Sequence, residues 1–222
     1  MLIIIVLPIL ICYLLGSIPV GYILTKIFVK IDIRQTGSGN IGATNVLRTG
    51  GKKLALATLL LDAAKCFPAI FVADMVYAWF YRYDMNMRSD GAYESFLIIG
   101  GLFAILGHCF PIWLKFTGGK GVATALGALL AAVPYAGLAA CATWLIVAKI
   151  TKTSSLSALI AVVVAPIVTL IIYGASPAII CALITLLVWI RHKDNIKRII
   201  KGEEPRIGAK KKEKSVEPVS NE

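Results

Sequence analysis

The strongest constraint on this sequence is a series of long apolar runs that contain almost no charged residues. They cover residues 2–27, 54–80, 93–114, 122–133, 135–150, 156–173 and 177–190. A segment in lipid must satisfy its backbone hydrogen bonds internally, so each run is expected to be a helix. Together with a mean hydropathy of +0.81, runs of this number and length predict an all-α integral membrane protein.

We predict seven transmembrane helices. The last four runs are short against the ~20 residues that a full crossing needs. Either these runs extend into their flanks, or the two runs beside Pro134 form one bent helix. The first run has no basic residue before Lys26 and no small-residue cleavage site at its end, so we expect a retained span rather than a signal peptide.

The basic residues are distributed unequally between the two faces that this topology creates. With the N-terminus outside, 20 of the 23 Lys and Arg residues fall on one face, in segments 26–53, 115–120, 149–152 and 191–222. The opposite face receives only Arg82 and Arg88. By the positive-inside rule, the basic face and the C-terminus are cytoplasmic.

The chain is predicted to form one membrane domain over residues 1–208 and a basic tail over residues 209–222. The tail is polar and charged, so we expect it to be disordered. It is either a solvated segment that sets topology or a segment whose lysines contact anionic lipid. The five cysteines lie singly in apolar surroundings without CxxC spacing, which favours packing roles over a metal site. No metal, cofactor or nucleic-acid partner is expected.

Four polar segments fall on the predicted cytoplasmic face. They are "TGSGNIGATNVLR" after the first span, "FTGGKGVAT" after the third, "KTSSLS" before the sixth and "RHKDNIKR" after the seventh. Glycine lets backbone N–H groups converge on an anion. Arg48 can add a bidentate phosphate contact, and Lys120 a point charge. The segments therefore indicate a phosphate site, unless the glycines serve only as tight turns and the cations only set topology.

The first segment also matches the dinucleotide fingerprint GxGxxG at Gly37, Gly39 and Gly42, with Asp62 twenty residues further on. The match is a false lead, because the motif follows a membrane span rather than a strand. Asp62 lies inside an apolar run, three residues before Lys65. Charges within a membrane are costly and are usually paired, so an internal ion pair is preferred over a substrate role.

The chain has two histidines, and they have different surroundings. His192 precedes Asn195 by three residues, so the two side chains share a helix face. That pair can bind a polyol or phosphate, or His192 can move a proton; the alternative is a histidine that only ends a helix. His108, in "LGHCFPIW", comes before Pro111, where packing or a helix-end role is preferred.

Three segments together resemble the signature motifs of the bacterial acyl-phosphate:glycerol-3-phosphate acyltransferases of the PlsY type. The segments are "GSGNIGATNVLR", "GHCFPIWLKFTGGKGVATALG" and "RHKDNIKRIIKGEEPRIG". The stretches "LLGSIPVGYIL" and "LLLDAAKCFPA" also fit, so the resemblance extends over nearly the whole chain to Gly208. It implies a seven-span enzyme of the bacterial inner membrane, with an external N-terminus and a cytoplasmic active site.

The resemblance also implies the reaction. An acyl group would move from acyl phosphate to the 1-hydroxyl of glycerol 3-phosphate, giving 1-acyl-glycerol 3-phosphate (lysophosphatidic acid) and phosphate at the start of phospholipid synthesis. The expected partners are these two substrates and membrane lipids. The enzyme that supplies acyl phosphate is a further candidate partner.

Site residues follow from the motifs. The first motif supplies substrate-binding residues, which are Gly37, Ser38, Gly39, Asn40, Thr44, Asn45 and Arg48. The second supplies Lys120, and the third supplies His192 and Asn195. The expected catalytic residues are Ser38, Lys120, His192 and Asn195. We expect His192 mainly to position glycerol 3-phosphate, while the substrate phosphate assists proton removal.

Two positions depart from the family pattern. Thr117 replaces the first lysine of "FKGGKG", and Ala158 stands where a "SLAS" pattern has its second serine. Ser155 or Ser157 is therefore expected to contribute to substrate binding. Neither histidine is followed by the HxxxxD spacing of the other large glycerol-phosphate acyltransferase group.

Two other classes of protein remain as alternatives. An anion transporter would explain the spans and the cations, but it predicts inverted halves or polar groups across the membrane. A non-catalytic lipid-binding scaffold gives no reason for four polar segments on one face.

Overall fold

The computed structural model describes residues 2–81 and 91–207, and every regular element within them is helical. The elements are α1 (Leu2–Ser17), α2 (Val20–Phe28), η1 (Ile33–Gln35), α3 (Ala43–Thr49), α4 (Gly51–Ala64), α5 (Cys66–Tyr81), α6 (Ala92–Cys109), η3 (Ile112–Leu114), α7 (Val122–Ala132), α8 (Pro134–Thr151), α9 (Ser154–Tyr173), α10 (Ala175–Arg191) and α11 (Lys193–Ile200). Arg82, Arg88 and the predicted tail at 209–222 lie outside the described residues.

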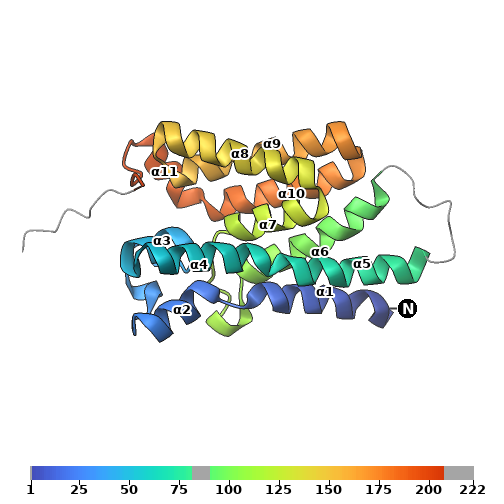
Figure 1. Ribbon diagram of the computed structural model, residues 1–222, viewed down its shortest axis with the longest axis horizontal. Helices are drawn as coiled ribbons and strands as arrows, with labels where there is room; N and C mark the ends of the chain where they lie inside the picture. Colours follow the sequence, from blue (N-terminus) through green and yellow to red (C-terminus); the bar gives the residue numbers. More distant parts are fainter. Residues whose placement is uncertain (1, 82–90, 208–222) are drawn as a thin grey trace, which may run out of the picture.

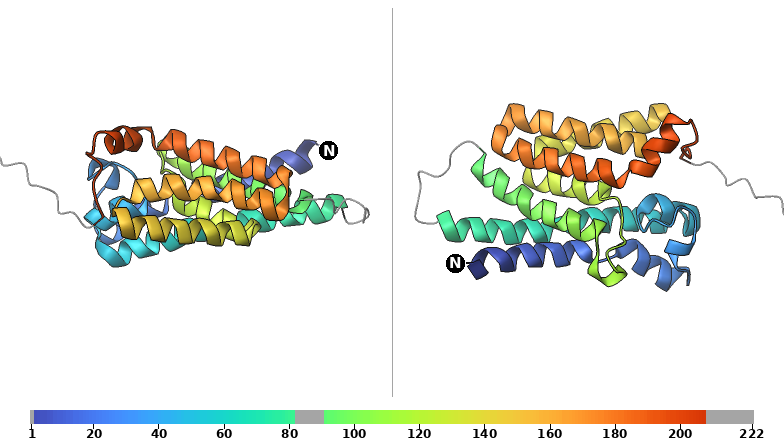
Figure 2. Two further views of the ribbon diagram at one scale, coloured as in Figure 1. Left: turned by 90° about the horizontal axis from the view of Figure 1, so that it is seen from above. Right: turned by 180° about the vertical axis from the view of Figure 1, so that it is seen from behind.

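The long helices run roughly side by side along one axis of the molecule (Figure 1). Helices α2, α3 and α11 gather at the end opposite the N-terminus, and the views from above and behind agree (Figure 2). The turn between α8 and α9 lies at the same end. Three of the four polar segments therefore lie at one end of the bundle, and hydrogen bonds from Lys120 to Asn195 and from Arg191 to Gly118 tie the fourth to them.

Two predicted spans are each broken in the middle. The first divides into α1 and α2 around Pro19, and the second divides into α4 and α5 at Lys65. Proline lacks an N–H and clashes with the carbonyl four residues earlier. Pro68 therefore cannot donate to the carbonyl of Ala64, four residues earlier. The helix is interrupted there: Ala64 is the last residue of α4, and Pro68 lies in the first turn of α5. In the first break, the carbonyl of Ile18 accepts a hydrogen bond from the Lys65 side chain.

The two runs beside Pro134 form separate helices rather than one bent helix. Pro134 begins α8, where its missing N–H costs nothing. α7 and α8 pack closely at Gly137. A Cβ at this position would lie only 2.5 Å from the Leu130 amide nitrogen, so the close approach requires glycine. α7 has only 11 residues, fewer than a full crossing needs.

Residues 2–81 and 91–207 contain five helical segments long and apolar enough to span a membrane, or six if the bent pair α10 and α11 counts as one span. Both broken segments, residues 5–28 and 51–80, qualify as single spans. The architecture is thus that of a multi-pass membrane protein. The count of seven spans stays a prediction, since α7 is too short to qualify by length.

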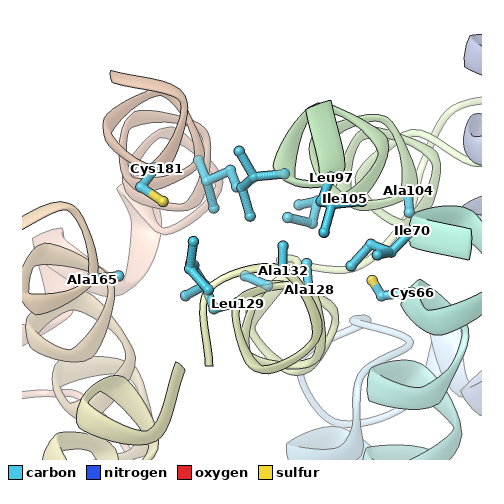
Figure 3. Packing of buried hydrophobic residues seen from close by; sticks show 14 of the residues in the cluster. Cys66, Ile70, Leu97, Ala104, Ile105, Ala128, Leu129, Ala132, Ala165 and Cys181 are labelled. Atoms are coloured by element: carbon cyan, nitrogen blue, oxygen red, sulfur yellow. The ribbon is translucent and has the colours of Figure 1, made fainter. Parts of the chain in front are cut away.

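Small residues allow the helices to pack closely. The core in Figure 3 includes Cys66, Ala104, Ala128, Ala132 and Ala165 on neighbouring helices. Small side chains of this kind let membrane helices approach each other. Large apolar side chains instead cover the outside, with exposed fractions of 77% for Ile171, 70% for Trp79 and 63% for Leu145. Such a surface suits contact with lipid.

Candidate active site

The first-motif loop, residues 36–42, is organised from below by one buried side chain. Asn45 is 1% exposed, and its amide nitrogen lies 2.9–3.2 Å from three backbone carbonyls, those of Ile33 in η1 and of Thr36 and Asn40 in the loop. Its Oδ1 accepts the Ser38 N–H at 3.0 Å. Asn45 is therefore engaged on both sides of its amide group by the loop itself.

The glycines of this loop are required by its shape. Gly37 and Gly39 have φ of +60° and +71°, a region that L side chains rarely adopt. A Cβ on Gly37 would also lie 2.1 Å from the Oδ1 of Asn45. The turn leaves Ser38, Gly39 and Arg48 exposed, so its outer surface is open to a ligand.

The second-motif loop, residues 116–121, is held from two sides. On the inner side, the Gly118 and Gly119 N–H groups donate to the carbonyls of Cys109 and His108 at 3.2 and 3.0 Å. On the other side, Arg191 donates from Nη2 and Nε to the carbonyls of Gly118 and Gly119, both at 3.1 Å. Both glycine peptides are thus fixed, and they lead directly to Lys120.

Lys120 lies at the centre of a polar cluster drawn from three motif segments. Its Nζ donates to the Oδ1 of Asn195 at 2.5 Å, and the Nδ2 of Asn195 donates to the Oε1 of Glu204 at 2.6 Å. Ser155 donates to the same Oε1 at 2.7 Å, and Arg198 pairs with Oε2 at 2.7 Å. A hydroxyl, an amide, an ammonium and a guanidinium therefore converge at one place.

The electrostatics of the cluster are strongly positive around Lys120. The pKa of Lys120 is lowered to about 8, mainly by burial, with a smaller lowering by the charges of Arg198, Arg191 and Arg48 and an opposing effect of Glu204. Burial also acts to raise the pKa of Glu204, but hydrogen bonds from Ser155, Asn195 and Arg198 outweigh it, so this pKa is lowered. The carboxylate stays ionised and balances part of the cationic charge.

His192 is buried at the junction of α10 and α11, where the chain bends by 66°. Its Nδ1 lies 2.7 Å from the carbonyl of Val188, and a carbonyl can only accept, so the proton is on Nδ1. Nε2 is then left with a lone pair. Burial lowers the pKa of His192 to about 4, so the ring is neutral near pH 7 and can accept a hydrogen bond from a hydroxyl.

The two candidate serines of α9 differ in their contacts. Ser155 joins the polar cluster through Glu204, whereas the Ser157 hydroxyl donates to the Thr153 carbonyl of its own helix at 2.8 Å. Thr44 links the first motif to the same helix, since its Oγ1 lies 3.4 Å from the Oγ of Ser154. Ser155, not Ser157, is placed beside Lys120 and Asn195.

The predicted pair of Asp62 and Lys65 is present, with Nζ 3.0 Å from Oδ1. It has a third member that the sequence did not predict, because the Nδ1 of His108 lies 2.7 Å from the same Nζ. The expectation of a packing or helix-end role for His108 holds, since it is the penultimate residue of α6 and 4% exposed.

Arg191, Arg198 and Glu204 belong to the site although no local pattern in the sequence singles them out. All three lie in the third motif, within "RHKDNIKRIIKGEEPR", and their partners are up to 73 residues away in the chain. The one available signal was the presence of an acidic pair in a strongly basic segment.

In residues 2–81 and 91–207, no group of three or more His, Cys, Asp or Glu side chains is arranged to hold a metal ion.

Comparison with known proteins gives a consistent result. The model of the Glycerol-3-phosphate acyltransferase family matches residues 6–202. The glycerol-3-phosphate acyltransferase of Rhodospirillum rubrum is 52% identical over 202 residues, covering 90% of this chain and 89% of the relative. That of Agrobacterium fabrum is 48% identical over 201 residues, covering 90% and 91%.

Two solved structures share the fold. They are crystal structures of PlsY (YgiH), an integral membrane glycerol 3-phosphate acyltransferase, in its glycerol 3-phosphate form and its lysophosphatidic acid form. Their TM-scores are 0.78 and 0.75 at 34% and 33% identity, with 91% of this chain and 95% of each of those chains covered. These matches extend over nearly all of the chain and include the second and third motifs that meet at Lys120. The chain belongs to the glycerol-3-phosphate acyltransferase family.

Proposed function

We propose that this protein transfers an acyl group from acyl phosphate to the 1-hydroxyl of glycerol 3-phosphate. The products are 1-acyl-glycerol 3-phosphate and inorganic phosphate, and the step begins phospholipid synthesis. Family membership supports the acceptor, and the two solved relatives are structures in a glycerol 3-phosphate and a lysophosphatidic acid form. Membrane lipids surround the enzyme, and the enzyme that supplies acyl phosphate is its proposed partner.

One observation carries this proposal: the convergence of the motif segments on Lys120. Its Nζ contacts Asn195 of the third motif, and the positive charges of Arg48, Arg191 and Arg198 act on it. Both proposed substrates carry phosphate, which such a cluster attracts. Because the cluster is partly removed from water, each charge interacts more strongly there than at an open surface. The acyl chain of the donor would lie beside lipid, next to the apolar outside of the bundle.

Each candidate residue has a role consistent with its contacts. Lys120 and Arg48 would contact substrate phosphate, Arg48 through the two parallel hydrogen bonds that a guanidinium allows. Ser38 on the exposed loop, with Thr44 and Ser155, would add hydroxyl donors. Gly37, Gly39 and Asn40 form the turn that presents Ser38, and Asn45 shapes this turn from below.

The chemical step needs a proton acceptor for the attacking hydroxyl. The 1-hydroxyl oxygen attacks the acyl carbon, the bond from that carbon to the phosphate oxygen breaks, and phosphate leaves. We propose that the substrate phosphate, whose second pKa is about 6, takes the proton. His192 accepts a hydrogen bond from the 2-hydroxyl of glycerol 3-phosphate through Nε2 and, with Asn195, holds the substrate in place, so the proton of the 1-hydroxyl stays available to the phosphate. Because acyl phosphate has its own leaving group, this transfer uses no cofactor.

We also propose seven spans, with an external N-terminus and a cytoplasmic active site in the bacterial inner membrane. The charge distribution supports this orientation. In a cysteine-free background, Thr49→Cys should react with an impermeant thiol reagent only from the cytoplasmic side. Labelling from the outer side would refute the orientation.

The function is tested by incubating purified protein with acyl phosphate and labelled glycerol 3-phosphate. We expect equal amounts of 1-acyl-glycerol 3-phosphate and inorganic phosphate. Transfer from an acyl thioester but not from acyl phosphate would refute the proposed donor and keep the acceptor. If proteoliposomes accumulate glycerol 3-phosphate without forming any acylated product, the protein is a transporter.

A further inference from the structure

A network of three ionisable side chains is buried inside the bundle. Asp62, Lys65 and His108 are only 1%, 8% and 4% exposed. Lys65 Nζ lies 3.0 Å from Asp62 Oδ1 and 2.7 Å from His108 Nδ1, and the latter nitrogen lies 3.4 Å from the same Oδ1. The three groups therefore contact each other in a closed triangle.

The network joins the places where helices break. Lys65 is the residue between α4 and α5, and its Nζ also donates to the carbonyl of Ile18 at 3.3 Å, in the break between α1 and α2. His108 lies at the end of α6, directly before the second-motif loop. Three separate segments are thus fixed against one another beneath the site.

His108 contacts the second-motif loop in two ways. Its carbonyl accepts the Gly119 N–H at 3.0 Å. Its imidazole lies directly against the Gly119 Cα, since a Cβ there would be 1.9 Å from Nε2, with the Cε1 and Cδ2 atoms of the same ring next nearest. The ring forms the support beneath Gly119, one residue before Lys120.

A contribution to the stability of the fold does not by itself explain why three ionisable side chains are buried here. Ionisable groups inside a membrane are costly, and well-packed apolar side chains often replace a buried ion pair without loss of stability. What the network provides is fixed geometry, because the Lys65 ammonium lies between the carboxylate of Asp62 and the Nδ1 of His108 and restricts the orientation of both. That geometry determines where the imidazole lies, and hence where the Gly119 backbone can lie.

We propose that Asp62, Lys65 and His108 are positioning residues that set the second-motif loop so that Lys120 stands in its catalytic place. They act through the Gly118–Gly119 backbone and do not contact substrate themselves. The role of Lys120 in this inference rests on the proposed function. The geometric part, that the imidazole sets the position of Lys120, can be measured without substrates.

The first test is His108→Ala, which leaves the ion pair of Asp62 and Lys65 intact and so should fold. We expect kcat/KM for glycerol 3-phosphate to fall about tenfold or more, mainly through KM, because small misplacements of catalytic groups are costly. In a Lys120→Ala background the same substitution should add little. A full additional loss in that background would overturn the proposal.

Thr58→Val is the matched control. Thr58 is a fully buried polar residue of α4, and its hydroxyl donates only to the Leu54 carbonyl of the same helix at 2.8 Å. The substitution removes a buried hydroxyl near the network without touching the loop. We expect unchanged KM for glycerol 3-phosphate. A rise in KM equal to that of His108→Ala would mean that loss of any polar group in this region has the same effect, which would overturn the proposal.

A second readout does not depend on activity. Competitive chemical labelling at several pH values gives the pKa of the Lys120 amine, which burial and neighbouring cations lower to about 8. If His108→Ala loosens the loop, Lys120 becomes more solvated and its pKa rises towards the model-compound value of about 10.4. An unchanged pKa would overturn the positioning role, even if the wild-type protein proves to have another activity.

The third test uses relief of a clash. Gly119→Ala places a methyl group on the imidazole, so it should displace the loop and lower kcat/KM. Combining it with His108→Ala removes the clash, and the double variant should exceed Gly119→Ala alone. Gly118→Ala is the control, because its Cβ would lie 2.3 Å from the His108 carbonyl oxygen and from Pro111 Cδ, which His108→Ala leaves in place. Equal rescue of both variants, or of neither, would contradict the proposal.

Discussion

The two glycine-rich loops of the site have similar composition but are built differently. The first-motif loop is exposed and turns through two glycines of positive φ around a single buried Asn45. The second is fixed within the bundle, with its N–H groups directed at α6 carbonyls and its carbonyls at Arg191. The first therefore presents several polar groups at an open surface. The second delivers one cation to a partly desolvated position.

This difference sets the expected strength of each contact. Exposed charges are screened by water and salt, so a contact made by Arg48 is weakened at high ionic strength. Lys120 is hydrogen-bonded within the cluster and partly removed from water, where a charge contact is stronger. Substitutions in the two loops should therefore differ in magnitude and in their dependence on salt.

The largest effect is expected from Lys120→Ala. The loss of a charged hydrogen bond in a desolvated site costs about 3 kcal/mol, which corresponds to a fall in kcat/KM of about a hundredfold or more. The fall should vary little with salt. Lys115→Ala is the control, since Lys115 is an exposed lysine near the same loop and should keep full activity. Equal loss in both variants would show that the second loop works only through its general positive charge.

Asn45→Ala should damage the first loop while leaving the second intact. It removes the amide that holds three carbonyls and the Ser38 N–H, and groups left unsatisfied there cost about 1–3 kcal/mol each. That cost falls mainly on the stability of the loop, and the resulting misplacement of Ser38 should lower kcat/KM roughly thirtyfold. The pKa of Lys120, measured by labelling, should stay near 8. A shifted Lys120 pKa would show that the loops are not independent.

Arg48→Ala should have a smaller effect, roughly tenfold on kcat/KM, because the side chain is exposed. The loss should shrink as salt is raised, since the wild-type contact is itself screened. Arg48→Lys should restore activity only in part, because lysine cannot form the two parallel hydrogen bonds of a guanidinium. Full recovery with lysine would remove the bidentate contact from the account.

His192→Asn should raise the KM for glycerol 3-phosphate several-fold and lower turnover less. Because the pKa of His192 is about 4, the ring does not titrate between pH 5 and 8. The acidic limb of the activity profile should then come from substrate phosphate, with a pKa of about 6, and should persist in the variant. Turnover reduced about a thousandfold with intact binding would instead identify His192 as the general base.

The smallest effect is expected from pH on the wild-type enzyme. The pKa of Lys120 is lowered to about 8, so its ammonium is present below that pH and is lost above it. KM for glycerol 3-phosphate should therefore rise several-fold between about pH 7 and 9, since substrate phosphate would no longer meet the charge. Because Lys120→Ala removes the titrating group, that variant should show no such rise.

The sequence was informative where a pattern is local. Apolar runs predicted helices, and the spacing of Asp62 and Lys65 predicted an ion pair that the structure contains. Proline at residue 134 left open a bent helix or two helices, and only packing resolved it. The breaks in the first two spans were missed, because apolar runs around Pro19 and Pro68 look continuous by composition.

The rest of the site depends on contacts between distant segments. Glu204 receives hydrogen bonds from Ser155, 49 residues away, and Arg191 holds carbonyls more than 70 residues away. No spacing in one sequence encodes such pairs. Asn45 shows a different limit: its substrate contact stays a prediction, while its buried amide is bonded to the loop. Residue type alone does not separate a side chain that binds from one that shapes the binding loop.

The central claim is that the motif segments form one phosphate site around Lys120. It is tested most directly by solid-state NMR in lipid bilayers, through the dipolar coupling between the ¹⁵N-labelled Lys120 Nζ and the phosphorus of bound glycerol 3-phosphate. A direct N–H···O–P hydrogen bond predicts a strong coupling that disappears in Lys120→Ala while Lys115→Ala retains it. Bound glycerol 3-phosphate without coupling to Lys120 would place the phosphate elsewhere and contradict the account.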